Sequence, residues 1–508
     1  MRRYHKQIVL DVLKSMYESG KQGDYANCQD LALSLCDFID EQLGTGSEIV
    51  ELLMVYAEMC FKANSGETSN KYLEKYLIKV ENIVKFDTPI SKIEVVFLSY
   101  KASMSDSIES IYLEAKKDPM CNAIFMPIPY YDRLPNGELG QMNYEGEDFY
   151  DTTKINITDY KDYNIELQRP DVIINFNPYD ENNRVTSIHP DYYFSNLKKH
   201  TDLLIYCPYF IDGDNMKDVF TQNCGTIISH KTILWSDTSK KQHLDTFTNL
   251  LKSNDNDDLT NEQIEELNNK FIVLGSPKID KVVNSTKTEF ELPKEWENII
   301  GRNKSIILFN TSIGGMLEHG DTYIKKLKNI LQTFKNSKDI VLWWRPHPLI
   351  GTTYKSMRVH LLQEYTQILN AYREDGWGIL DESAQPHRAL AYADGYYGDS
   401  GSSLQYMYIV KGKPIMCINF QIENHLHTNI DFCQFDLNKE QNMKICEDVF
   451  LNESTNFTLE DFIKYVLNQK KSSNKVSEKQ IQLFSETYKN TDGTAGKHIY
   501  NFIKKGCL

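Results

Sequence analysis

The sequence predicts two doubly wound α/β domains preceded by a helical module. Three observations favour this fold class: the length of 508 residues, two series of short apolar runs alternating with helical patterns, and an initial stretch with helical periodicity alone. A chain of this length exceeds one compact domain. Short runs rich in β-branched and aromatic residues are typical of buried parallel strands whose two faces are covered by helices.

Residues 1–90 have the spacing of amphipathic helices. Apolar residues recur at three- and four-residue steps from Ile8 to Met16, and further helical stretches follow at about 47–63 and 67–84. No fixed-period motif indicates a helical repeat. We therefore expect a helical accessory module.

The two α/β series divide the rest of the chain. Residues 91–270 form the first expected domain, with apolar runs at 94–100, 123–128, 172–176, 203–206 and 226–229, and the first series of runs ends with 271–274 at the domain boundary. Residues 271–470 form the second, with runs at 306–309, 340–344, 378–380, 395–397 and 414–419 and helices at about 322–335 and 354–372. Residues 471–508 contain a final predicted helix at about 475–505, which in such proteins can cross back to the first domain.

Charge and composition exclude several classes of protein. There are 56 Lys plus Arg against 71 Asp plus Glu, a net charge of −15, which repels a nucleic-acid backbone and argues against nucleic-acid partners. No run reaches the ~18 apolar residues of a membrane helix, and the first residues lack signal-peptide features. The ten cysteines are scattered without a C-x-x-C pair, which predicts reduced thiols, a cytoplasmic protein and no metal site.

The acidic segment 253–260 superficially resembles a calcium loop. Leu259 stands where an oxygen ligand is needed, and the turn glycine is absent. We instead expect a capping box, with Thr260 as the N-cap and Gln263 reaching back.

Ligands of open parallel sheets bind at the carboxyl ends of the strands. Arg345 and His347 follow the run at 340–344 and alternate with two prolines, an arrangement suited to holding phosphate oxygens. The alternative is that Arg345 pairs with a surface carboxylate and that His347 merely packs.

A second candidate phosphate site follows the run at 395–397. It is a small-residue loop before a helix, where backbone N–H groups, hydroxyls and the helix dipole would converge on an anion. The candidate donor-binding residues are Asp399, Ser400, Ser402 and Ser403. The alternative is a plain N-cap by Ser402 or Ser403. The loop is neither a Walker A motif nor a dinucleotide fingerprint, and two phosphate-binding strand ends together suggest a diphosphate.

The first α/β domain supplies the acceptor-side candidates. His189 lies in a polar loop and is the best candidate for a general base, with His200 and His230 as weaker ones. Its alternative role is a histidine satisfied by local hydrogen bonds. Three further acceptor-side candidates follow the run at 94–100: Lys101, Ser103 and Asp106.

Three motifs together resemble a known family. Gly275-Ser-Pro-Lys-Ile-Asp280, Arg345-Pro-His-Pro348 and Asp399-Ser-Gly-Ser-Ser403 resemble the CDP-glycerol glycerophosphotransferases, the teichoic-acid primases and polymerases of Gram-positive bacteria. The likeness is best over residues 200–420. It implies a GT-B architecture, in which two Rossmann-like domains face a cleft.

The resemblance also implies an activity. The family transfers glycerol phosphate from CDP-glycerol to a hydroxyl of a lipid-linked polymer, releases CMP and uses no tightly bound cofactor. His347 is similar to the family's histidine near the donor phosphates, and Asp399, Ser402 and Ser403 are similar to its residues at the phosphate-binding helix. The family's usual context for the acceptor-side histidine, a His followed by Gly, is absent here, so His189 rests on this chain's own pattern.

Two other functions and a second donor stay open at this point. The chain could be a GT-B glycosyltransferase that uses a nucleotide sugar, or a non-catalytic scaffold of a wall-polymer assembly. CDP-ribitol is an alternative donor to CDP-glycerol. A lipid-linked acceptor implies peripheral contact with the inner face of the plasma membrane, for which Lys198-Lys199, Lys470-Lys471 and Lys504-Lys505 are candidates, although solvated surface also explains lysine pairs.

Overall fold

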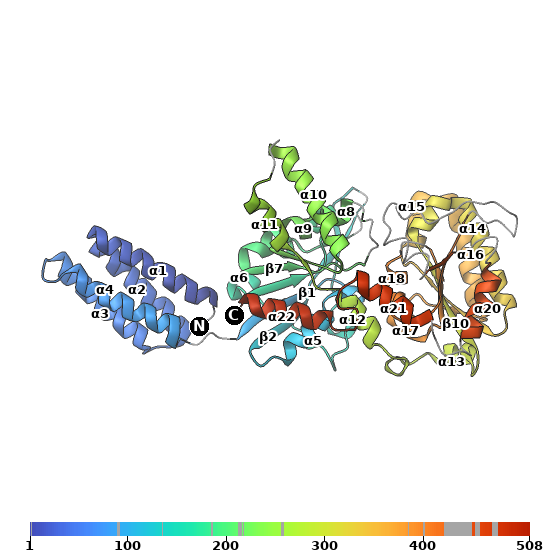
Figure 1. Ribbon diagram of the computed structural model, residues 1–508, viewed down its shortest axis with the longest axis horizontal. Helices are drawn as coiled ribbons and strands as arrows, with labels where there is room; N and C mark the ends of the chain where they lie inside the picture. Colours follow the sequence, from blue (N-terminus) through green and yellow to red (C-terminus); the bar gives the residue numbers. More distant parts are fainter. Residues whose placement is uncertain are drawn as a thin grey trace.

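The computed structural model shows a helical bundle followed by two α/β units along the long axis of the molecule (Figure 1). The residues described are 1, 3–88, 92–134, 136–183, 186–211, 216, 218–255, 259–384, 386–399, 402–420, 450–452, 458–469 and 476–507. The fold class predicted from the sequence, a helical module and two doubly wound sheets, is therefore confirmed.

The N-terminal module is a bundle with its own core. Its helices are α1 (Arg3–Gln22), α2 (Tyr25–Leu43), α3 (Glu48–Asn64) and α4 (Asn70–Asn82). Asp24 and Ser47 cap α2 and α3 by accepting hydrogen bonds from Asn27 N and Val50 N. Apolar residues at helical spacing, among them Val9, Leu53 and Val80, pack into a cluster separate from those of the α/β units.

The first α/β unit is built on a six-stranded parallel sheet of order β2-β1-β5-β7-β8-β9. Its strands are β1 (Ile93–Ser99), β2 (Cys121–Pro127), β5 (Val172–Asn175), β7 (Leu203–Tyr206), β8 (Lys231–Leu234) and β9 (Phe271–Val273). A small antiparallel sheet adds β3 (Tyr130–Arg133), β4 (Leu139–Asn143) and β6 (Thr186–Ile188). The helices of this unit are α5 (Glu109–Lys117), α6 (Ile165–Gln168), α7 (Phe194–Leu197), α8 (Asp218–Thr221), α9 (Cys224–Ile228), α10 (Asp237–Asp255) and α11 (Asn261–Lys270).

The second unit repeats the plan with the order β12-β11-β10-β13-β14-β15. Its strands are β10 (Ser305–Thr311), β11 (Ile340–Pro346), β12 (Ile379–Leu380), β13 (Gly395–Gly398), β14 (Ile415–Cys417) and β15 (Phe450–Asn452). Successive residues of β10 alternate between two cores, with Leu308 packed in one and Phe309 in the other. This two-residue period explains why the run is continuously apolar: both faces of the sheet are buried.

Helices cover both faces of the second sheet. They are α13 (Lys294–Ile300), α14 (Ile313–Asn336), α15 (Ile350–Met357), α16 (Val359–Asp375), α17 (His387–Tyr392), α18 (Ser403–Ile409), α20 (Leu459–Gln469) and α21 (Val476–Thr487). Helix α12 (Pro277–Asn284) lies at the junction of the two units, in contact with α5 on one side and with α17 and α18 on the other (Figure 1).

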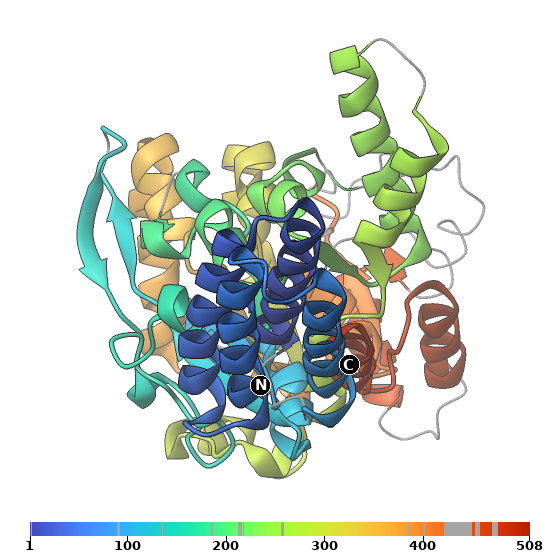
Figure 2. The ribbon, with the colours of Figure 1, turned by 90° about the vertical axis from the view of Figure 1, so that its left-hand side faces the viewer.

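The last helix, α22 (Ala495–Cys507), packs against α5 and α12 and so lies on the first unit (Figures 1 and 2). Its first amides, Ala495 N and Gly496 N, donate to the two carboxylate oxygens of Asp280 at 2.9 and 2.7 Å. Farther along, Tyr500 and Lys504 donate to Asp118 at 2.9 and 2.6 Å. A carboxylate at a helix N-terminus and a lysine near its C-terminus both suit the helix dipole.

Several sequence-based expectations need correction. The predicted strand at 226–229 is wrong, because Asn223 and Thr226 form a capping box that starts helix α9, and the strand follows as β8. The helix expected at 354–372 is divided at Arg358 into α15 and α16, and the terminal helix is divided into α21 and α22. The capping box of Thr260 and Gln263 is confirmed at the start of α11.

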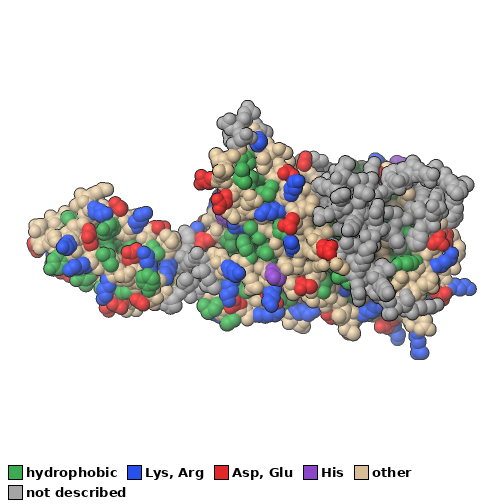
Figure 3. Space-filling model, in the orientation of Figure 1, with side chains coloured by type: hydrophobic (Ala, Val, Ile, Leu, Met, Phe, Trp, Pro, Cys, Tyr) green, Lys and Arg blue, Asp and Glu red, His purple; other side chains and the backbone are tan. Residues whose placement is uncertain are grey.

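The surface mixes charges of both signs over the bundle and the first unit (Figure 3). Of the lysine pairs considered for membrane contact, Lys198 and Lys199 are exposed, Lys504 is bound to Asp118, and Lys470-Lys471 lies outside the described residues. Across the described residues, no helix combines the length and the apolar character needed to cross a bilayer.

Candidate active site at the carboxyl ends of the two sheets

Each sheet has a point where its strand order reverses. β1 lies between β2 and β5, and β10 lies between β11 and β13. The carboxyl ends of strands at such a switch point leave a crevice between loops that run in opposite directions, which is where open α/β sheets bind ligands. The segments after β1 and β5 in the first sheet, and after β10, β11 and β13 in the second, are therefore the candidate site.

At the second switch point, the dipeptide Thr311-Ser312 contacts residues of two predicted motifs, His347 and Asp399. His347 N donates to Thr311 O at 3.0 Å, and the next residue, Ser312, donates its N–H to Asp399 Oδ2 at 2.5 Å. The Arg-Pro-His-Pro segment and Asp399 are thereby fixed on either side of the end of β10. Asn310 adds a third bond, from Nδ2 to Ser402 Oγ at 2.9 Å.

Asp399 is a buried carboxyl group at the N-terminus of α14. Burial raises its pKa to about 7, and the hydrogen bonds from Ser312 only partly oppose this shift. Its Oδ1 has no hydrogen-bond partner among the described residues. Gly315 packs so closely that a Cβ there would lie 2.6 Å from Asp399 Oδ2. The carboxyl group is thus enclosed, and near neutral pH it can carry a proton.

Ser402 and Ser403 occupy the start of α18. Ser402 is the N-cap, and its Oγ accepts a hydrogen bond from Leu404 N at 3.3 Å, as the capping alternative predicts. Ser403 is the first helical residue and is half-buried. Ser400 lies outside the described residues. Phosphate binding by Asp399, Ser400, Ser402 and Ser403 stays a prediction.

Arg345 is buried and already has a carboxylate partner. Its Nη1 lies 2.9 Å from Asp381 Oδ2, and its Nη2 donates to Ser383 O at 2.6 Å. Asp381 is fully buried and also accepts from Trp343 Nε1 at 2.9 Å. The guanidinium therefore holds the segment after β12 in place. The alternative interpretation expected a carboxylate partner at the surface, whereas Asp381 is buried. A direct phosphate contact of Arg345 stays a prediction.

His347 has the geometry of a neutral hydrogen-bond donor. Its Nδ1 accepts from Leu349 N at 3.2 Å, so the neutral ring carries its proton on Nε2. Desolvation of the ring at the strand end, followed by the charge of Arg345, lowers the pKa of His347 below its usual value. The residue itself is exposed, so Nε2–H can meet a ligand.

The candidates after β1 lie in a 3₁₀ segment, η2 (Ala102–Ser107). Lys101 precedes it, with its Nζ 5.0 Å from the centre of the Tyr130 ring, and Ser103 is half-buried. Asp106 is buried and bonded by Lys278 Nζ at 2.5 Å and by His387 Nε2 at 2.9 Å. Burial works to raise the pKa of Asp106, but these two partners outweigh it and hold the pKa below its usual value. Asp106 is thus engaged in protein contacts rather than open to an acceptor.

His189 follows β6 on the small antiparallel sheet. Its Nδ1 accepts from Asp191 N at 3.3 Å and lies 3.5 Å from Asp191 Oδ2, and its ring contacts the rings of Tyr131 and Tyr192. The local hydrogen bonding foreseen as its alternative role is present. The role of His189 as a base stays a prediction.

Some residues of the site carried signals that sequence reasoning missed. Ser312 and Gly315 open α14 directly after β10, and a serine with two glycines between a strand and a helix is a recognisable pattern. Lys278 belongs to the Gly275–Asp280 motif, but neither Lys278 nor His387 carries a local sign of its contact with Asp106, because they meet that residue from 172 and 281 residues away in the chain.

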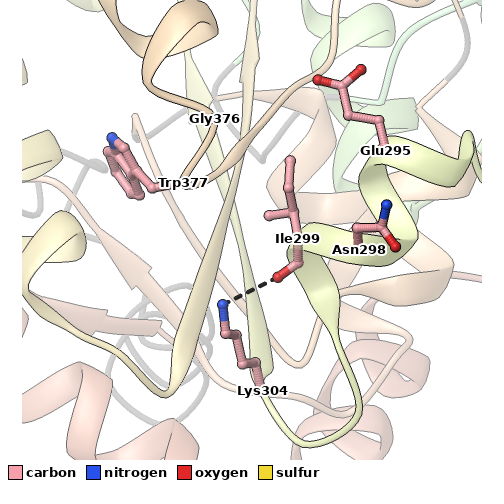
Figure 4. Close-up of a pocket in the computed structure, with 6 residues that line it drawn as sticks. All are labelled: Glu295, Asn298, Ile299, Lys304, Gly376 and Trp377. Atoms are coloured by element: carbon pink, nitrogen blue, oxygen red, sulfur yellow. Dashed lines mark hydrogen bonds between the residues drawn. The ribbon is translucent and has the colours of Figure 1, made fainter.

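Two other features of the described residues do not belong to this site. Asp180, Glu181 and Cys224 bring two carboxylates and a thiol within 4.8 Å of one another, but burial raises the pKa of Cys224, which disfavours the thiolate that a metal needs. A pocket lined by Glu295, Asn298, Ile299, Lys304, Gly376 and Trp377 lies at the amino ends of β10 and β12, the edge of the sheet opposite the switch point (Figure 4).

Comparisons with known proteins show likeness at the level of the fold. No family model matches the sequence, and no curated protein matches it. A protein from Listeria monocytogenes described as a UDP-N-acetylglucosamine 2-epimerase is similar with a TM-score of 0.50 at 13% identity, over 82% of this chain and 97% of that one. The wall teichoic acid polymerase TagF has a TM-score of 0.46 at 14% identity, over 91% and 98% of the two chains. The S. aureus MnaA–UDP structure has a TM-score of 0.47 at 12% identity, over 82% and 96%. With the two sheets described above, the Listeria likeness shows that the chain has the GT-B fold of two Rossmann-like domains after a helical module.

Proposed function

We propose that this protein is a transferase that moves glycerol phosphate from CDP-glycerol to a hydroxyl of a lipid-linked wall-polymer acceptor and releases CMP. The observation that carries the proposal is the joining of two motifs at the second switch point. His347 bonds to Thr311 and Asp399 bonds to Ser312, so the two segments resembling the family's donor site lie side by side where a parallel sheet binds its ligand.

The donor would lie on the second unit. Neutral His347 would donate from Nε2 to a phosphate oxygen, and the start of α18, with Ser403 as its first residue, would offer N–H groups and a hydroxyl to the diphosphate. Donors aimed at oxygens that gain charge during transfer lower the barrier because they are oriented in advance.

The acceptor would enter from the first unit. Its hydroxyl oxygen would attack the phosphorus that bears glycerol, forming the new O–P bond while the bond to the CMP oxygen breaks on the opposite side. His189 would take the hydroxyl proton on Nδ1. This breaks the 3.3 Å bond from Asp191 N, and Asp191 Oδ2, 3.5 Å away, would then stabilise the imidazolium.

Calorimetric titration of the full chain tests the donor assignment. CDP-glycerol, CDP-ribitol, UDP-glucose and CMP are compared on the wild type, on Ser403→Ala and on Ser356→Ala, an exposed serine of α15 that serves as the control. Selective binding of a CDP-alditol that weakens only in Ser403→Ala supports the proposal. Preference for UDP-glucose would indicate glycosyl transfer, and absence of nucleotide binding would favour a scaffold; either result contradicts the proposed donor.

A further inference from the structure

Asp106 is the meeting point of residues from three parts of the chain. One carboxylate oxygen accepts from Lys278 on α12 at 2.5 Å, and the other faces Nε2 of His387, the first residue of α17, at 2.9 Å. We call Asp106, Lys278 and His387 the Asp106 cluster. All three are buried, with exposed fractions of 4%, 8% and 1%. A carboxylate so placed is stable only while its partners remain.

The cluster connects the two Rossmann-like units. Asp106 belongs to η2, directly after β1 of the first sheet, whereas His387 belongs to the second unit. Lys278 lies on α12, which is also attached to the first unit by Lys281, whose Nζ donates to Glu109 at 2.6 Å. Helix α12 also packs on the second unit, through Ile279 and Val282. The bond between His387 and Asp106 adds a direct side-chain link between the two units at the same junction.

On the second unit, the link continues to the donor motif. Arg345, at the end of β11, binds Asp381 and Ser383, and the chain then leads into α17 and His387. On the first unit, the link ends at Asp106, which lies in the same short segment as Lys101 and Ser103. The network thus spans the carboxyl edges of both sheets.

The orientation of the His387 ring indicates that its bond to Asp106 of the other unit determines the position of the ring. Its Nδ1 is buried and has no hydrogen-bond partner among the described residues, while Nε2 faces the Asp106 carboxylate. A histidine placed for local stability would be expected to satisfy both ring nitrogens. Among the described residues, the hydrogen bond of its side chain is the one to the other unit.

We infer that Asp106, Lys278 and His387 are positioning residues, and that together with Arg345 they hold the donor-side and acceptor-side strand ends in the register needed for transfer. Phosphoryl transfer depends on placement, and a displacement of about 1 Å can cost on the order of 100-fold in rate. The inference rests on the proposed function for its kinetic part, whereas its structural part, a fixed angle between the units, does not.

The kinetic test separates donor binding from transfer. Since the donor would lie on the second unit alone, His387→Ala should bind CDP-glycerol within about twofold of the wild type but transfer at least about tenfold more slowly. His387→Gln, whose side-chain amide can donate to Asp106, should restore most of the rate. The inference would be overturned if His387→Ala lost donor binding and transfer rate to the same extent, or if it transferred at the wild-type rate. It would also be overturned if His387→Gln did not restore the rate.

The structural test needs no substrate and keeps the inference distinct from the proposed function. Small-angle scattering of the full chain should show a wider distribution of distances between the units in His387→Ala and in Asp106→Asn than in the wild type. Lys328→Ala, which removes an exposed ion pair with Glu364 within the second unit, should leave the profile unchanged. An unchanged profile in His387→Ala and Asp106→Asn would overturn the inference even if the wild type uses CDP-glycerol.

Discussion

Ser312 N–H donates a 2.5 Å hydrogen bond to Asp399 Oδ2, and this bond joins the end of β10 to the loop after β13. It occupies the N-terminus of α14 with a side chain of the protein itself, which suits the helix dipole. The bond also places Asp399 across the end of β10 from the His347 segment, so the loops of the candidate donor site have one common support.

Replacing Asp399 by Asn should change how stability depends on pH. Burial raises the pKa of Asp399 from 3.8 to about 7. Between these values the native protein keeps a proton that the unfolded chain has lost, so stability falls as pH rises through this window. The wild type should lose on the order of a few kcal/mol more than Asp399→Asn between pH 4 and 7. Urea denaturation at several pH values measures the free energy of unfolding of both proteins. If that free energy changes with pH to the same extent in both, burial does not raise the pKa of Asp399.

Gly315→Ala should destabilise the second unit, whereas Gly314→Ala should not. A Cβ at 315 would lie 2.6 Å from Asp399 Oδ2, but at 314 its nearest neighbour is Ser312 Oγ at 3.7 Å. Overpacking costs about 1–3 kcal/mol, whereas Gly→Ala in an open helical position gains up to about 1 kcal/mol. Thermal unfolding of the two variants should therefore shift in opposite directions. If the melting temperatures of Gly315→Ala and Gly314→Ala shift by the same sign and size, Asp399 is not closely enclosed.

Arg345→Ala should be far more costly than Arg373→Ala. Arg345 and Asp381 form a buried pair, and removing one partner of such a pair costs about 3–5 kcal/mol. Arg373 and Glu382 are about half exposed, and such pairs contribute about 0–1 kcal/mol. Fluorescence of Trp343 and Trp344, buried on β11, reports unfolding of this region in urea. Similar denaturation midpoints for the two variants would argue against Arg345 as the residue that holds the 381–383 segment.

Gly496→Ala should loosen α22 from the first unit. A Cβ there would lie 2.6 Å from Ser110 C and 2.8 Å from Ile111 N, whereas one at Gly506, in the same helix, would meet nothing within 4 Å. Hydrogen exchange of the α22 amides should accelerate in Gly496→Ala and remain as in the wild type in Gly506→Ala. Equal protection in both variants would mean that α22 does not depend on this close approach to α5.

Local patterns predicted the parts of the fold that depend on local physics. The apolar runs of β1, β5 and β10 were found because both faces of each sheet are buried, and the Thr260–Gln263 box was found because capping is a short-range interaction. The strand predicted at 226–229 is wrong because that prediction also depends on local composition. Its residues favour a strand, but the Asn223 and Thr226 side chains bond to the backbone and start a helix.

Contacts between distant segments could not be predicted in this way. Nothing near His387 indicates that it meets Asp106, 281 residues away, and nothing near Arg345 indicates that its partner is Asp381. The Ser312–Gly315 turn did carry a local pattern, but its role depends on Asp399, which reaches it through sheet pairing. The sequence thus predicts which strand ends form the candidate site. It does not predict which side chains of these distant segments pair with one another.

The most direct test of the account is CMP release from CDP-glycerol in the presence of a lipid-linked acceptor with a free hydroxyl. The wild type should release CMP, and His347→Ala should do so on the order of 100-fold more slowly, because a donor to the phosphate oxygens is lost. His360→Ala, which changes an exposed histidine of α16, should retain the wild-type rate. No CMP release by the wild type, or equal release by His347→Ala, would contradict the proposed transfer reaction and the place of His347 in it.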